Sequence, residues 1–242
     1  MKCADQAPPF QTIVFDCDST LAAIEGIDAL CSPEQRESVA ALTDRAMQGE
    51  LPLEAVFGQR LELVRPSRAD LERVTQAYIE SALLNAKQSI ALLKRAEKRL
   101  VIVSGGLLPA VEGFARWLGI DEVRAVPIQF DAEGRYAGFG NSHPLANAGG
   151  KIEVVRQLRE GAGSREAMVL IGDGATDLEA AGEVQRFIAF GGVVRRENVF
   201  AAASIQHSSP NFAQLLPLLL SPAEIEAARD WPEFAPLLSQ IN

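Results

Sequence analysis

The segment FQTIVFDCDST at residues 10–20 joins a short apolar run to a cluster of polar residues. A run of this length and composition predicts a buried strand whose end delivers polar side chains to a surface. The same pattern returns in RLVIVSGG at residues 99–106 and in AMVLIGDG at residues 167–174. The chain therefore contains three predicted strands that each end in aspartate, serine or glycine.

Helical patterns separate these predicted strands, at residues 89–96, 108–118 and 151–159. Repetition of strand, polar turn and helix predicts an α/β fold with a doubly wound parallel sheet. In such a sheet, ligands bind beyond the carboxyl ends of the strands. We therefore expect the polar residues that follow the three strands to form one site.

The connection between the first two predicted strands is too long for a single crossover helix. Residues 22–86 look helical, and capping-box patterns at Ser32–Gln35 and Ser67–Asp70 predict two helix starts within them. We interpret residues 22–86 as an inserted helical cap domain. Residues 1–21 and 87–242 then form the catalytic core.

Two further segments complete the predicted organisation. Residues 128–130 and 136–139 flank the loop DAEGR and predict a hairpin attached to the core. The proline-rich tail after Ser208 predicts short helices packed on the edge of the core.

Composition restricts the class of protein. The chain has 242 residues, of which 48% are hydrophobic and 23% charged, as in ordinary soluble globular proteins. A net charge of −9 disfavours binding to nucleic acid and to anionic lipid surfaces, so neither is an expected partner.

The sequence has neither an apolar stretch of membrane-spanning length nor the apolar core of a signal peptide near its start. Cys3, Cys17 and Cys31 lack metal-ligand spacing and indicate reduced thiols in a cytoplasmic protein.

The pair Asp16 and Asp18 carries the first chemical signal. A carboxylate at the end of a buried strand can attack phosphorus and form an aspartyl-phosphate. A second carboxyl group two residues later can protonate the leaving group and afterwards deprotonate water. Two aspartates that only shape a turn are the alternative, but the pattern D-x-D-x-T directly after an apolar strand is much rarer than D-x-D alone.

The residues Ser104, Gly105 and Gly106 follow the second predicted strand and precede a helix. A hydroxyl group and glycine N–H groups at a helix N-terminus predict an anion site, while a serine that only caps the helix is the alternative. Lys151 opens a later helix, where its charge could hold a phosphate oxygen or keep Asp16 ionised. Taken alone, Lys151 would be a surface lysine.

Asp173 and Asp177 follow the third predicted strand, four residues apart. Carboxylates that converge on a phosphate site suit Mg²⁺, which takes one or two carboxylates and keeps several waters. Helix capping by Asp173 or Thr176 is the alternative. A cation is nevertheless expected, because Asp16 is an anion and its attack on a phosphate dianion requires charge neutralisation.

Four motifs in this order, each at the end of a strand, resemble those of the haloacid dehalogenase superfamily. Further elements narrow the resemblance to the phosphoserine phosphatase family within it. The elements that carry it are Phe15–Thr20, Glu25–Asp28, Arg45–Met47, Val103–Gly106, Tyr136–Phe139, Gly149–Lys151, Ile171–Asp177 and Phe190–Gly192. They cover most of residues 10–211 in the order of the family.

The resemblance implies a role for each matching residue. Asp16 would be the nucleophile and a Mg²⁺ ligand, and Asp18 the general acid/base whose backbone carbonyl also binds the metal. Asp173 would be the second carboxylate ligand, and Asp177 would act through water or in the outer shell. The residues implied on the phosphate and substrate side are Thr20, Glu25, Met47, Arg60, Ser104, Gly105, Gly106, Lys151, Thr176 and Arg196.

Arg60 can also be argued from the residues alone. Leu53, Val56, Phe57, Leu61 and Val64 form an apolar stripe at helical spacing, and Arg60 falls in the middle of it. A buried guanidinium needs an anionic partner, and a substrate carboxylate is a good candidate. An arginine whose charged end reaches out from the edge of the stripe is the alternative.

The family resemblance implies Mg²⁺-dependent hydrolysis of O-phospho-L-serine to serine and phosphate, the last step of phosphorylated serine synthesis. The predicted cap departs from the family pattern, for example at Ala22-Ala23-Ile24. Because the cap selects the substrate, another small phosphate ester is an alternative substrate. A signalling module that only holds phosphate on Asp16 is a second rival, opposed by the cap and by Asp18. Phosphoryl transfer to a second alcohol and a homodimer also stay open.

Overall fold

A computed structural model describes residues 8–47, 53–162 and 167–241. Its centre is a six-stranded sheet in the order β3-β2-β1-β6-β7-β8, in which all neighbouring strands are parallel. The strands are β1 (Thr12–Phe15), β2 (Arg99–Leu107), β3 (Glu122–Val126), β6 (Met168–Gly172), β7 (Arg186–Phe190) and β8 (Ile205–His207). The strand order reverses between β1 and β6, so the predicted doubly wound sheet is confirmed.

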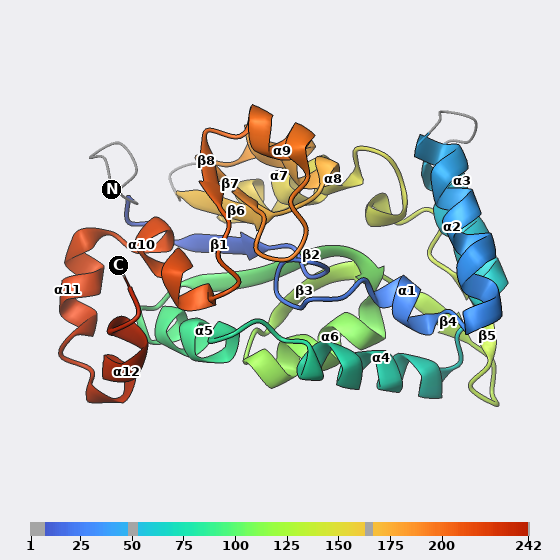
Figure 1. The fold of residues 1–242 in the computed structure, drawn as a ribbon, viewed down its shortest axis with the longest axis horizontal. Coiled ribbons are helices and arrows are strands. Elements are labelled where there is room, and N and C mark those ends of the chain that lie inside the picture. Colours follow the sequence, from blue (N-terminus) through green and yellow to red (C-terminus); the bar gives the residue numbers. More distant parts are fainter. Residues whose placement is uncertain (1–7, 48–52, 163–166, 242) are drawn as a thin grey trace.

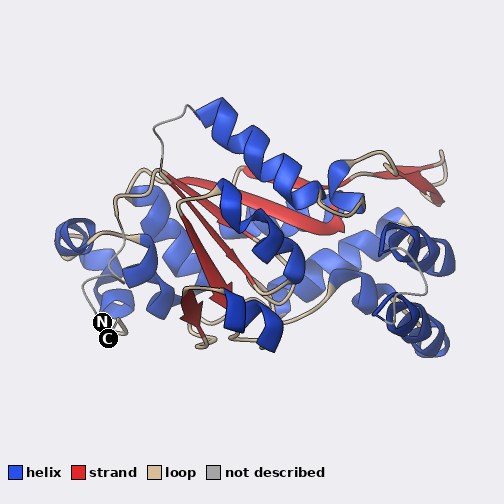
Figure 2. Ribbon diagram, turned by 90° about the horizontal axis from the view of Figure 1, so that it is seen from above, coloured by secondary structure: helices blue, strands red, loops and turns tan. Residues whose placement is uncertain are grey.

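Helices cover both faces of this sheet, as the view from above shows (Figure 2). One face carries α5 (Ala86–Arg95) and α6 (Leu108–Leu118), and the other carries α7 (Gly150–Ala162), α8 (Ala175–Glu179) and α9 (Glu197–Ala202). Successive strand residues point to opposite faces. Accordingly Ile13 and Phe15 enter the apolar core on the α5–α6 side, while Val14 enters the core on the α7 side.

The described residues between β1 and α5 form four helices. They are α1 (Gly26–Leu30), α2 (Pro33–Met47), α3 (Leu53–Val64) and α4 (Arg68–Glu80). Both predicted capping boxes are present, because Ser32 and Gln35 exchange hydrogen bonds before α2, and Ser67 and Asp70 do so before α4. Strand β1 points toward α1, with α2 and α3 beyond it, whereas α4 runs along α6 (Figure 1).

A hairpin formed by β4 (Ile128–Phe130) and β5 (Tyr136–Phe139) lies beside α2 and α3 in Figure 1. The predicted hairpin is therefore confirmed. Its packing was not predicted, because it contacts the inserted helices as well as the core. The rings of Phe139 and Phe57 are 5.6 Å apart, and Arg68 lies over the ring of Phe130.

The tail after Ser208 forms short helices at the end of the sheet opposite α2 and α3 (Figure 1). They are η4 (Phe212–Leu215), α10 (Leu216–Leu219), α11 (Pro222–Ala228), η5 (Pro232–Phe234) and α12 (Ala235–Leu238). Phe212 packs 5.8 Å from the ring of Phe15, and the buried Lys98 forms an ion pair with Glu224. The predicted packing of this tail on the core is confirmed. In the part of the chain that the structure describes, no helix is long and apolar enough to cross a membrane.

Candidate active site

Three carboxylates meet where β1 and β6 end. Asp16 follows β1, Asp173 follows β6, and Asp177 lies in the first turn of α8. One carboxylate oxygen from each lies within 4.8 Å of the other two, and all three residues are buried. The hydroxyl group of Thr20 donates a hydrogen bond of 3.3 Å to Oδ1 of Asp173, which ties the loop after β1 to the end of β6.

Burial and mutual repulsion raise the pKa values of two of these carboxyl groups, Asp173 and Asp177. Burial, with the charge of Asp16, raises the pKa of Asp173 to about 6. The same two causes raise the pKa of Asp177 to about 7. Three hard oxygen donors at such close range are the ligand set that a small divalent cation prefers. The residues present therefore fit a divalent cation, which would relieve the repulsion between them.

Lys151 supplies a positive charge beside this group. Its Nζ lies 3.0 Å from Oδ1 of Asp16 and 2.7 Å from Oδ1 of Asp177, and its side chain is only 6% exposed. Burial acts to lower the pKa of Lys151, but the carboxylates of Asp16 and Asp177 outweigh it and raise that pKa above its ordinary value. Lys151 is thus a buried, charged residue and not the surface lysine that it would be in isolation.

Asp18 occupies a separate environment, although it lies only two residues after Asp16. Its Oδ1 accepts hydrogen bonds from the backbone N–H of Gly26 at 2.9 Å and from the hydroxyl group of Tyr78 at 2.6 Å. Burial, followed by the charge of Glu25, raises the pKa of Asp18 to about 7. A carboxyl group with such a pKa can both donate and accept a proton near neutral pH.

The structure corrects the prediction for Ser104, Gly105 and Gly106. These residues do not form the turn that begins a helix, because β2 continues through them to Leu107, with a shift of register after Val103. The Ser104 hydroxyl oxygen accepts a hydrogen bond from Gly106 N at 2.9 Å and does not cap α6. Ser104 is buried, whereas Gly105 is exposed at the end of the strand.

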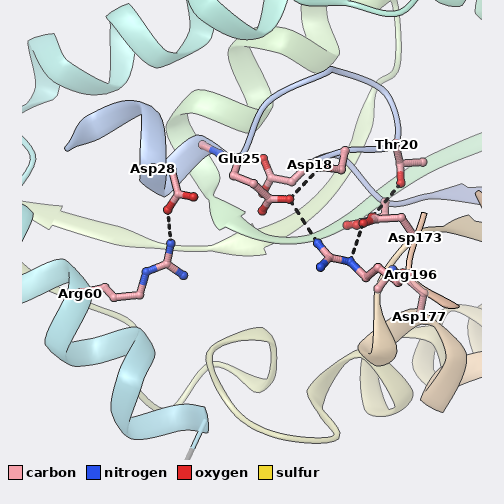
Figure 3. Close-up of polar contacts among 12 residues, drawn as sticks. Asp18, Thr20, Glu25, Asp28, Arg60, Asp173, Asp177 and Arg196 are labelled. Carbon is pink, nitrogen blue, oxygen red and sulfur yellow. Dashed lines mark hydrogen bonds and ion pairs between the residues drawn. The ribbon is translucent and has the colours of Figure 1, made fainter. Parts of the chain in front are cut away.

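Arg196 connects two of the predicted site residues (Figure 3). Its Nε donates a hydrogen bond of 3.0 Å to Oδ2 of Asp173, and its Nη2 lies 3.6 Å from Oε1 of Glu25. The same oxygen of Glu25 accepts a hydrogen bond of 2.7 Å from Ser19. Thr176 lies close by, half-buried in the first turn of α8. Glu25, Arg196 and Thr176 therefore border the carboxylate group.

Arg60 lies beside Asp28, whereas Arg196 lies near Glu25, at the other end of the Glu25–Asp28 segment (Figure 3). Its side chain is 21% exposed and forms an ion pair with Asp28, so the protein itself supplies one anionic partner. Its Nε is buried and has no hydrogen-bond partner among the described residues. This N–H group could therefore donate a hydrogen bond to a second acceptor. Met47 ends α2, but its side chain lies outside the part of the chain that is described.

Two residues that contact the predicted site residues were not predicted from the sequence. Tyr78 donates a hydrogen bond to Asp18, and Asp28 forms an ion pair with Arg60. Leu71, Val74 and Tyr78 form the buried face of α4, so a tyrosine stands where an apolar residue would suffice. A buried hydroxyl group needs a partner, and this was the available signal. Its partner, Asp18, could not be identified without the fold.

The two described cysteines, Cys17 and Cys31, are both free and buried. Cys17 lies between Asp16 and Asp18, and burial raises the pKa of its thiol well above the ordinary value. A thiol with a raised pKa is a poor nucleophile. Cys3 lies outside the described residues.

Comparisons of sequence and of structure with known proteins both find hydrolases that act on phosphate esters or belong to their family. The sequence pattern of the haloacid dehalogenase-like hydrolases matches residues 13–182. The phosphoserine phosphatase of Bos taurus is 36% identical over 192 residues, which cover 77% of this chain and 84% of that protein. The phosphoserine phosphatase of Drosophila melanogaster is 34% identical over 209 residues, covering 85% of this chain and 77% of that protein. A solved structure described as a phospho-aspartyl intermediate analogue of phosphoserine phosphatase is 25% identical, with a TM-score of 0.70, over 86% of this chain and 98% of that chain.

Proposed function

The chain belongs to the haloacid dehalogenase-like hydrolases, and we propose that it hydrolyses O-phospho-L-serine to L-serine and phosphate by way of phosphate bound to Asp16. One observation carries this proposal. Asp16 lies in the carboxylate group beside Lys151, whereas Asp18, two residues away, is held apart by Gly26 and Tyr78. Two carboxyl groups in such different environments suit two different tasks, attack and proton transfer.

Asp16 and Asp173 would hold a Mg²⁺ ion, together with the backbone carbonyl of Asp18. Asp177 already contacts Lys151 and the N–H of Gly174, which favours a role through water or behind the direct ligands. When bound, the cation neutralises negative charge on the phosphate and on the carboxylates, and so lowers the repulsion between them.

In the first step, a carboxylate oxygen of Asp16 attacks phosphorus. A bond forms between that oxygen and phosphorus, and the bond between phosphorus and the serine oxygen breaks. Asp18 gives its proton to the departing serine oxygen, which is a poor leaving group without one. Lys151, the Ser104 hydroxyl group and the N–H group of Gly105 bind the phosphate oxygens during this step.

In the second step, Asp18 is a carboxylate and takes a proton from a water molecule. The water oxygen forms a bond to phosphorus, and the bond between phosphorus and Asp16 breaks. Phosphate leaves, and both carboxyl groups return to their starting protonation states. A module that only stored phosphate on Asp16 would have no need of a half-buried acid beside it.

Residues 22–86 form the cap in this proposal, and they select the amino-acid part of the substrate. Phosphoserine carries an ammonium and a carboxylate, and each needs a partner of opposite charge when it leaves water. Glu25 is the proposed partner of the ammonium. Arg60, whose Nε has no partner in the described part of the chain, is the proposed partner of the carboxylate. The identity to phosphoserine phosphatases over most of the chain supports phosphoserine as the substrate.

A panel of phosphate esters with Mg²⁺ tests the substrate. Phosphoethanolamine lacks the carboxylate of phosphoserine, and 3-phosphooxypropionate lacks its ammonium. Each should lose about ten- to a hundredfold in kcat/KM relative to O-phospho-L-serine, because one charged contact is missing. A phosphate ester without either group that is hydrolysed as well as phosphoserine would identify a different substrate.

A further inference from the structure

Tyr78 contacts Asp18 from a helix that the predicted chemistry does not use. Its hydroxyl group donates a hydrogen bond of 2.6 Å to Oδ1 of Asp18, and the side chain is only 1% exposed. The backbone N–H of Gly26 donates to the same oxygen at 2.9 Å. Both donors come from residues 22–86, whereas Asp18 belongs to the loop after β1.

Packing against the core fixes the position of the Tyr78 ring. The ring stacks on Phe114 of α6 at 5.4 Å between centroids, and Phe114 stacks on Trp117 at 6.0 Å. Helix α6 lies directly on the sheet that carries Asp16 and Asp18. The hydroxyl group is therefore held at a fixed place relative to the catalytic loop.

The other oxygen of Asp18, Oδ2, lies toward the end of β2. A Cβ atom built on Gly106 would be 3.4 Å from Oδ2 of Asp18 and 3.1 Å from the hydroxyl oxygen of Ser104. Ser104 and its neighbours are the residues proposed to bind phosphate. Oδ2 thus borders the proposed phosphate site, while Oδ1 accepts hydrogen bonds from Gly26 and Tyr78.

We infer that Tyr78 is a positioning residue, which with Gly26 fixes the rotation of the Asp18 carboxyl group and so places its proton on Oδ2. Because Oδ1 already accepts two hydrogen bonds, a proton on Asp18 belongs on Oδ2, the oxygen that faces the phosphate site. Free rotation of the carboxyl group would place that proton productively only part of the time. This inference rests on the proposed function, since it assigns Asp18 the proton transfer.

The approach of Tyr78 also explains why residue 26 is glycine. A Cβ atom at this position would lie 2.1 Å from the hydroxyl oxygen of Tyr78 and 2.9 Å from Cζ. Real atoms do not approach so closely, so any larger residue would displace the Tyr78 hydroxyl group from Asp18. Gly26→Ala is therefore an independent way to break the same contact.

The replacement Tyr78→Phe tests the inference, because it keeps the stacked ring and removes only the hydroxyl group. Tyr136→Phe is the matched control, since Tyr136 is the only other tyrosine of the chain and lies in the hairpin strand β5. Three rates should be measured with Mg²⁺: phosphorylation of Asp16 by an alkyl phosphate, its phosphorylation by p-nitrophenyl phosphate, and decay of the phosphoenzyme. A thermal melt checks that each variant is folded.

Tyr78→Phe should slow phosphorylation by phosphoserine, or by the best alkyl ester of the panel, about ten- to a hundredfold, because the lost hydrogen bond is to a carboxyl group that becomes charged as it gives up its proton. Phosphorylation by p-nitrophenyl phosphate should stay within about twofold, because its leaving group departs without a proton. Decay of the phosphoenzyme should slow by about the same factor as the alkyl reaction, since that step needs Asp18 as a base. Gly26→Ala should give the same pattern, and Tyr136→Phe should behave as wild type.

Equal slowing of the alkyl and aryl reactions by Tyr78→Phe would overturn the inference and make the tyrosine a structural residue. Decay of the phosphoenzyme at the wild-type rate would also overturn it. If Tyr78→Phe does not fold, Gly26→Ala decides by the same comparison. A wild-type preference for an ester other than phosphoserine would refute the proposed substrate alone, because the alkyl-to-aryl comparison does not depend on serine.

Discussion

Nζ of Lys151 lies 3.0 Å from Oδ1 of Asp16, although 135 positions separate the two residues in the sequence. The contact joins the end of β1 to the start of α7 across the point where the strand order reverses. Lys151 also touches Asp177, so one buried ammonium offsets two of the three clustered carboxylates. The charge balance of the site in the absence of a cation therefore depends on this lysine.

Replacement of Lys151 by alanine should lower the free energy of unfolding by roughly 3–5 kcal/mol at mildly alkaline pH, because buried carboxylates lose their partner. Added Mg²⁺ should restore part of this loss. Urea unfolding with and without Mg²⁺ measures both effects. Lys94→Ala is the control, because the ion pair of Lys94 with Asp121 is exposed and should contribute about 1 kcal/mol or less. Similar losses in the two variants would contradict the proposed charge balance.

Mg²⁺ should raise the thermal midpoint of the protein, and its removal by a chelator should abolish phosphate release. Asp173→Asn should lose the thermal shift, because it removes one ligand of the carboxylate group, whereas the exposed Asp121→Asn should keep it. Ca²⁺ should bind and inhibit, since it accepts more ligands and readily takes both oxygens of a carboxylate, including the one that attacks. Equal rates with Ca²⁺ and Mg²⁺ would contradict the double role of Asp16.

Much of the fold could be predicted from the sequence because it depends on local patterns. The apolar runs before Asp16 and Asp173 identified two central strands, and capping boxes located the starts of α2 and α4. The end of β2 was predicted wrongly. Ser104, Gly105 and Gly106 are typical of a turn, but pairing with β3 resumes at Leu107, and Ser104 satisfies the N–H of Gly106.

Only the site residues that directly follow a strand could be placed together from the sequence. Asp16 and Asp173 were expected to meet because adjacent parallel strands end at the same edge of the sheet. Contacts that depend on how inserted helices pack were not visible. Tyr78 donating to Asp18, and Asp28 pairing with Arg60, both require the positions of α1, α3 and α4 in space.

The replacement Asp16→Asn should lower phosphate release at least about a thousandfold, as the loss of a nucleophile does in enzymes with covalent intermediates. An amide is a poor nucleophile and a poorer metal ligand, so both proposed roles disappear together. Asp18→Asn should cost about 10²- to 10⁴-fold, the range of a general acid–base group. Circular dichroism should show both variants folded. An Asp16→Asn variant within tenfold of wild type would refute the covalent mechanism.

Arg60→Ala should lower kcat/KM for phosphoserine by a factor that corresponds to about 1.5–3 kcal/mol of transition-state stabilisation. This is the usual contribution of a hydrogen bond to a charged group. It should change little toward p-nitrophenyl phosphate, which has no carboxylate to bind. Glu25→Gln should show the same selectivity more weakly. Arg65→Ala is a control, because Arg65 pairs with Glu62 on the exposed surface. Equal losses of Arg60→Ala on both substrates would assign Arg60 to the structure or to the phosphate.

The most direct test of the covalent mechanism is to expose Asp18→Asn to p-nitrophenyl phosphate labelled in its phosphate, stop the reaction with acid and map the labelled peptide. The leaving group of this ester departs without a proton, so the first step does not need Asp18. The second step needs a base to activate water, so this variant should accumulate phosphate on the enzyme. The label should be found on Asp16, it should require Mg²⁺, and one p-nitrophenolate should be released for each phosphate bound. Label on any other residue, or phosphate release by wild type with no labelled enzyme under any quench, would contradict the covalent mechanism.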